Sequence, residues 1–114
     1  MSNSDPISSG IQHRHHRVEV EPGVRLTVHE WRPDTGLAPL VFVAGWVSVI
    51  EGWTPLLEVL VRQRPVFYVE TREKRSAVID RSRLRPNAFS IPRFGDDVIA
   101  ICDRLEVDPN RRVF

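Results

Sequence analysis

The sequence predicts an α/β fold in which an antiparallel hairpin leads into parallel strands with two flanking helices. Apolar and polar residues alternate on both sides of a Pro22-Gly23 turn, which is typical of a half-buried hairpin. An unbroken apolar run at residues 40–44 favours a parallel strand covered on both faces. Apolar residues then recur at helical spacing within residues 53–61 and 94–105.

The hairpin marks the expected start of the folded domain. Val18 and Val20 precede the turn, and Val24, Leu26 and Val28 follow it with period 2. Residues 1–17 are polar and rich in serine, so we expect a flexible N-terminal arm there and a domain over residues 18–114.

Local signals fix where the later elements begin and end. Pro55 suits the first turn of a helix, and Pro65 prevents that helix from continuing into the apolar strand expected at residues 66–69. Ser90 is a suitable N-cap for the second helix. Residues 111–114 have the character of the start of a further strand.

Composition and charge exclude several classes of partner. The net charge of +1 gives no long-range attraction to nucleic acid or to an anionic membrane. The single cysteine, Cys102, cannot form an internal disulfide, and no apolar run approaches the roughly 20 residues of a membrane span. No secretory signal opens the sequence. We therefore expect a soluble cytoplasmic protein with neither nucleic-acid nor membrane partners.

The order of the elements, from the hairpin onward, resembles the first half of the α/β-hydrolase fold. Two stretches carry the resemblance: Ala44-Gly45-Trp46 with the following Glu51–Leu57, and Phe89–Val98, which contains Asp96-Asp97. The resemblance implies a partial hydrolase domain that ends at the start of the fifth strand. It also implies a serine-dependent parent enzyme that cleaves small ester-like substrates and needs no cofactor.

Gly45 and Trp46 are the candidate site residues, through their backbone. In the family, the loop after the third strand donates one N–H to the oxyanion that forms during acyl transfer. By the resemblance, Trp46 supplies that N–H, and Gly45 lets the chain turn close to a substrate. The alternative is a plain strand-to-helix turn in which Gly45 only relieves steric strain.

The rest of the catalytic machinery has no counterpart in these 114 residues. The family's Gly-x-Ser-x-Gly turn follows the fifth strand, and this motif is absent from the sequence. Ala44 stands where the family often has histidine, and the loop at residues 70–76 keeps an acid and Arg72 but lacks the usual glycines. We expect the chain alone to lack the catalytic triad and to be inactive.

A second interpretation is a complete, non-catalytic α/β module that pairs with another chain through an exposed sheet edge. His13, His15 and His16, with His29, have the composition of a metal site, but the expected flexible arm favours none. Cys102 falls on the apolar helical face and is expected to be a buried thiol. The basic residues between positions 72 and 85 alternate with acids, which favours a solvated loop over a phosphate site.

Overall fold

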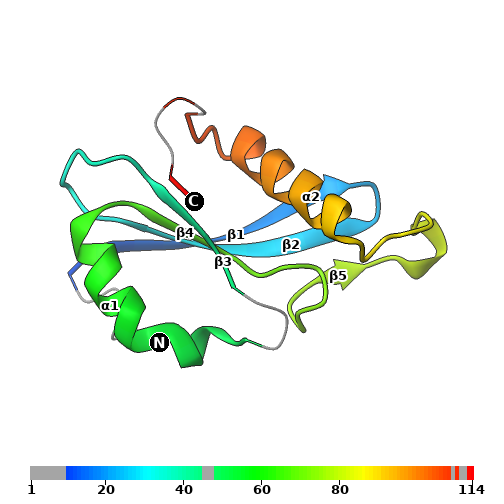
Figure 1. Ribbon diagram of the computed structural model, residues 1–114, viewed down its shortest axis with the longest axis horizontal. Helices are drawn as coiled ribbons and strands as arrows, with labels where there is room; N and C mark the ends of the chain where they lie inside the picture. The colour runs from blue at the N-terminus through cyan, green and yellow to red at the C-terminus, as the bar shows by residue number, and fades with distance from the viewer. Residues whose placement is uncertain (1–9, 45–47, 109, 111–112) are drawn as a thin grey trace.

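The computed structural model describes residues 10–44, 48–108, 110 and 113–114, which form a five-stranded mixed sheet with a helix on each face (Figure 1). The elements follow in the order β1 (Gln12–Glu21), β2 (Val24–Arg32), β3 (Leu40–Val43), α1 (Thr54–Gln63), β4 (Val66–Val69), β5 (Val78–Ile79) and α2 (Ile91–Arg104). Short 3-10 helices occupy Ile50–Trp53 and Arg81–Arg83. The predicted α/β fold, with an antiparallel hairpin, parallel strands and two flanking helices, is confirmed.

β1 and β2 form the predicted antiparallel hairpin around Pro22-Gly23. Gly23 has a φ of +87°, a left-handed conformation that favours glycine. A Cβ at this position would also lie 3.2 Å from the Arg83 side chain, so the turn is closely packed against the second 3-10 helix.

β1 begins earlier than the sequence predicts. Gln12 already pairs with Arg32, and the register continues without a break to Glu19. Residues 12–17 therefore belong to the sheet, and the boundary of the expected arm at residue 17 is corrected. The long partner strand supplies backbone hydrogen bonds whatever the side chains, whereas His13–Arg17 carries no apolar alternation to reveal a strand. The part of the expected arm at residues 1–9 lies outside the described residues.

The strands lie in the order β1-β2-β4-β3, in which the first two pairs are antiparallel and the last pair is parallel. β3 runs parallel to β4, with Leu40 opposite Val66 and Val43 opposite Val69. On the other side of β3, the Val41 N–H donates to the Val113 carbonyl at 2.7 Å in a parallel bridge. This places β3 between β4 and Val113. Residues 111–112 lie outside the described residues.

The side chains of β4 alternate between two cores. Val66 and Tyr68 pack with Leu57 and Val61 of α1, and Phe67 and Val69 pack with Ile101 and Cys102 of α2. All four residues of β4 are buried because helices cover both faces of the sheet here. Cys102 is buried, as expected from its helical face.

Both helices begin where the sequence predicts. α1 opens at Thr54-Pro55 and ends before Pro65. In α2 the Ser90 hydroxyl accepts a hydrogen bond from the Arg93 N–H at 3.3 Å, which confirms the predicted N-cap. Of the helices in the described ranges, none has the length and apolar character required to cross a membrane.

The charged segment between β4 and α2 contains one short strand that the sequence does not reveal. β5 pairs antiparallel with Val24 and Arg25 at the start of β2. Two residues are too few to show an alternating pattern, so the segment reads as a loop from sequence alone.

Candidate functional site

The carboxyl ends of β3 and β4 frame a pocket of about 250 Å³. In open α/β sheets, ligands bind outside the carboxyl ends of the strands. The lining residues come from the segment after β3, from β4 and from the loop that follows β4: Ser48, Val49, Ile50, Glu51, Tyr68, Glu70, Lys74, Arg75 and Ser76. The predicted oxyanion residues Gly45 and Trp46 lie outside the described residues, so their role stays a prediction. The pocket begins two positions after Trp46.

The carboxylate of Glu70, on the pocket wall, is bound by two neighbouring side chains. Its carboxylate lies 2.7 Å from His29 Nε2 of β2 and accepts a hydrogen bond from the Ser76 hydroxyl at 2.5 Å. The hydrogen bond with His29, aided by Ser76, lowers the pKa of Glu70 although burial opposes the shift. Glu70 is therefore held as a carboxylate at neutral pH.

This carboxylate does not build a hydrolytic triad. In a Ser-His-Asp triad the imidazole lies between the hydroxyl and the acid and takes the proton of the hydroxyl. Here Glu70 lies between Ser76 and His29, so the carboxylate binds both groups. The arrangement fixes the pocket wall rather than activating a nucleophile.

Tyr68 provides a buried hydroxyl on the same wall. Burial, followed by the negative charges of Glu70 and Glu51, raises the pKa of Tyr68 to about 12. Within the described part of the chain, its hydroxyl has no hydrogen-bond partner. The phenol is neutral at physiological pH and can donate to a bound group.

Arg72 anchors the loop beneath the pocket. Its side chain is fully buried, and its Nε and Nη2 each donate to one oxygen of Asp97 on α2 at 2.7 Å. Nη1 also donates to Glu21 at 3.1 Å and to the Ala88 carbonyl at 3.0 Å. The loop at residues 70–76 and the hydrolase-like stretch Phe89–Val98 thus meet in a bidentate ion pair between Arg72 and Asp97.

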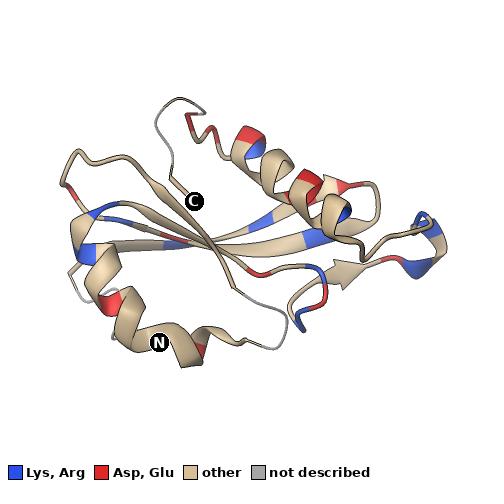
Figure 2. Cartoon of the chain, in the orientation of Figure 1, with Lys and Arg blue, Asp and Glu red and all other residues tan. Residues whose placement is uncertain are grey.

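The basic segment after β4 is interleaved with acids, as the sequence indicates. Figure 2 shows lysine and arginine along this segment with acidic residues beside them. Arg72 points into the core, and Lys74 lies 3.0 Å from Glu73. These two cations are already neutralised by neighbours, which supports a structural role for them.

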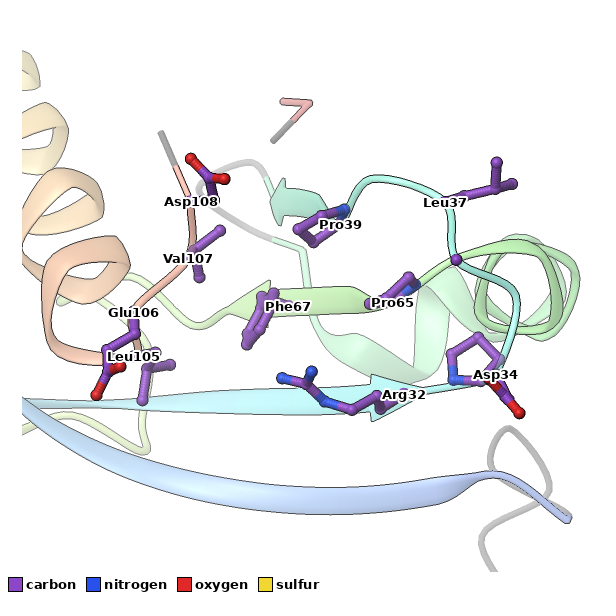
Figure 3. A pocket seen from close by; sticks show the side chains of 12 residues that line it. Arg32, Asp34, Leu37, Pro39, Pro65, Phe67, Leu105, Glu106, Val107 and Asp108 are labelled. Atoms are coloured by element: carbon purple, nitrogen blue, oxygen red, sulfur yellow. The ribbon is translucent and has the colours of Figure 1, made fainter. Parts of the chain in front are cut away.

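A second pocket of about 400 Å³ lies at the opposite end of the parallel strands. Pro39 and Pro65, which precede β3 and β4, line it together with Arg32 and the residues after α2. Figure 3 shows Phe67 of β4 extending toward the segment after α2. This second pocket lies at the amino ends of β3 and β4, whereas ligands in this fold bind at the carboxyl ends of the strands.

The histidines of the N-terminal stretch are divided between the two faces of the sheet. His13 and His15 on β1 lie beside His29 on β2, on the face covered by α1. His16 points to the other face, where its Nε2 lies 2.6 Å from Glu30. Of the four histidines considered from the sequence, His13, His15 and His29 therefore share one face of the sheet and His16 lies on the other.

Solved structures similar to this chain include an α/β-hydrolase, a protein named as a lipase and an epoxide hydrolase. An α/β-hydrolase from Novosphingobium aromaticivorans DSM 12444 superposes with a TM-score of 0.68 at 15% identity, over 86% of this chain and 33% of its own. A protein named as a lipase from Acinetobacter baumannii AYE gives 0.66 at 11% identity, over 88% and 31%. An epoxide hydrolase from Vigna radiata gives 0.62 at 19% identity, over 87% and 30%.

No protein-family model and no curated protein matches the sequence. The chain spans about a third of the length of the structures that it matches. Each of the three superposes over more than four-fifths of this chain. The hairpin, the parallel β3 and β4 and the Arg72-anchored loop therefore constitute the N-terminal portion of an α/β-hydrolase fold.

Proposed function

We propose that this chain is the N-terminal portion of a serine-dependent hydrolase domain that acts on carboxylic esters or related small substrates. The pocket at the carboxyl ends of β3 and β4 carries the proposal, because that end of the sheet receives ligands in open α/β folds. The similar structures include proteins named as a lipase and an epoxide hydrolase, which supports a hydrolytic reaction.

In this proposal the chain contributes binding and charge stabilisation. The backbone N–H of Trp46 donates to the developing oxyanion, and Gly45 allows the backbone to approach the substrate. Tyr68 and Glu70 shape the adjoining wall. The nucleophile, the histidine and the acid of the triad come from sequence beyond the portion described by these 114 residues.

The first test is made on the protein in its source cells. We expect an antibody against this sequence to detect a polypeptide longer than 114 residues that reacts with a fluorophosphonate probe for activated serines. A product of 114 residues that the probe does not label would contradict a catalytic role.

The oxyanion role of Trp46 is tested in that longer polypeptide. Trp46→Pro removes the backbone N–H, whereas Trp46→Ala keeps it and removes only the side chain. We expect Trp46→Pro to lower kcat for an ester substrate by about 10²–10³-fold relative to Trp46→Ala. Equal kcat values for the two variants, both correctly folded by circular dichroism, would assign the loop a purely structural role.

A second candidate function is that of a module that pairs with another chain along β3. An apolar surface lies along this edge around a pocket of about 330 Å³, which is lined by Leu40–Val43 with Leu60 and Phe114. Among the described residues, Val113 alone pairs with the outer side of β3. In the hydrolase proposal a further parallel strand covers this surface, whereas in the alternative a second copy of the chain does.

A further inference from the structure

Three imidazoles converge on the α1 face of the hairpin. His13 and His15 are two apart on β1 and share a face, and His29 of β2 lies directly opposite His15. One nitrogen from each of the three rings lies within 4.8 Å of the other two. The ring centroids of His15 and His29 are 4.5 Å apart, and those of His13 and His15 are 4.6 Å apart.

The His29 ring is oriented by a carboxylate. Its Nε2 is hydrogen-bonded to Glu70, which is itself held by Ser76, and this leaves Nδ1 as the nitrogen on the other side of the ring. Nδ1 is buried and has no hydrogen-bond partner among the described residues. A carboxylate that holds the second nitrogen of a ligating histidine is the usual outer shell of a metal site.

His13 and His15 differ in their surroundings. His13 stacks on Trp31 with ring centroids 4.6 Å apart and an interplanar angle of 8°, while His15 is exposed. In a tetrahedral zinc site with metal–nitrogen distances near 2.0 Å, the ligand nitrogens are separated by about 3.3 Å. The three nitrogens, which lie within 4.8 Å of one another, are already near this spacing.

We propose that His13, His15 and His29, brought together across the β1–β2 hairpin, bind a divalent transition-metal ion of the Zn²⁺ type. Three neutral imidazoles suit zinc, copper, nickel and cobalt, and do not suit the hard ions magnesium and calcium. Three histidines leave a fourth ligand to water in a tetrahedral site, and the exposure of His15 gives water access to the cluster. Glu70 contacts the ligand His29 and also lines the pocket, so this residue links the proposed ion site to the pocket.

The proposal is tested by titrating the metal-free 114-residue chain with ZnCl₂ in a calorimeter. We expect one saturable ion per chain, and an absorption spectrum of tetrahedral type when CoCl₂ replaces zinc. His15→Ala is the informative variant because an exposed side chain can be removed without disturbing the core. We expect it to weaken binding by at least the 10–100-fold that outer-shell changes produce, and Glu70→Gln to weaken binding within that range.

His16→Ala is the matched control, since this histidine is the next residue on β1 and faces away from the cluster. We expect it to bind zinc as the unaltered chain does. Zinc should raise the melting temperature of the unaltered chain and of His16→Ala, but not that of His15→Ala. Equal losses in His15→Ala and His16→Ala, or no saturable binding to the unaltered chain, would overturn the proposal.

Discussion

At the scale of single residues, the pocket wall contains a phenol that is kept neutral by its surroundings. Tyr68 has no exposed surface, and the carboxylates of Glu70 and Glu51 disfavour a further negative charge beside them. The pKa of Tyr68 is about 12 in the folded chain and 10.0 in the reference state. Between these two values the folded chain holds a proton that the unfolded chain has lost.

This difference predicts an alkaline loss of stability. Stability contributed by the protonated phenol is fully present below pH 10 and falls by about 1.4 kcal/mol per pH unit as the pH rises toward 12. Urea unfolding at pH 8, 10 and 11 measures the effect, and Tyr68→Phe, which has no phenol to titrate, should lack this component. Parallel pH curves for the two chains would show that Tyr68 does not titrate abnormally.

Contacts between individual side chains were the features least predictable from the sequence. Glu70 and His29 are 41 positions apart, and nothing in their local sequence indicates that they share a hydrogen bond. The histidines were visible as a group, but alternation along a strand decides which of them share a face. The only available signal was the spacing of two between His13 and His15, which becomes informative once that stretch is known to be extended.

At the scale of elements, two ion pairs that share Arg72 join three parts of the fold. Arg72 comes from the loop after β4, Asp97 from α2 and Glu21 from the end of β1. Removing one member of a buried pair leaves the other charged and without compensation, which costs far more than the pair itself contributes.

We therefore expect Asp97→Asn to lower the free energy of unfolding by about 3–5 kcal/mol. Asp96→Asn is the matched control, because its side chain is 75% exposed and lies 4.0 Å from Arg93. An exposed pair of this kind contributes about 0–1 kcal/mol. Urea titration followed by circular dichroism compares the two, and similar midpoints would mean that Glu21 and the Ala88 carbonyl are sufficient to compensate the buried Arg72 charge.

Most elements were predictable because each carries its own pattern. The helical spacing and proline limits of α1, and the N-cap of α2, are local signals that packing reinforces. The early half of β1 and the two-residue β5 were missed. Both depend on backbone pairing with β2, which leaves no mark in the side-chain pattern.

At the scale of the whole molecule, the outer edge of β3 is only partly covered by the described residues. Val43 is 43% exposed and Phe114 is 64% exposed, next to the apolar surface along this strand. A strand edge with unpaired backbone groups and apolar side chains favours pairing with another strand.

If the edge mediates self-association, Val43→Lys should shift the isolated chain toward monomer in sedimentation-velocity experiments over a range of concentrations. Val59→Lys is the matched control: it makes the same change at a 54% exposed position on α1, away from the edge. The same distribution of species for both variants would indicate that β3 is not the contact. A monomeric unaltered chain would remove the basis for the pairing module.

The sequence by itself determined the α/β class, the order of the main strands and helices and the likeness to the first part of a hydrolase fold. These follow from local hydrophobic periodicity and helix-limiting residues, which act over a few positions. Only the tertiary structure decided that Arg72 meets Asp97, that Glu70 holds His29 and that His13, His15 and His29 converge. Such contacts join side chains from different elements, so they depend on how the strands and helices are arranged relative to one another, which local periodicity does not specify.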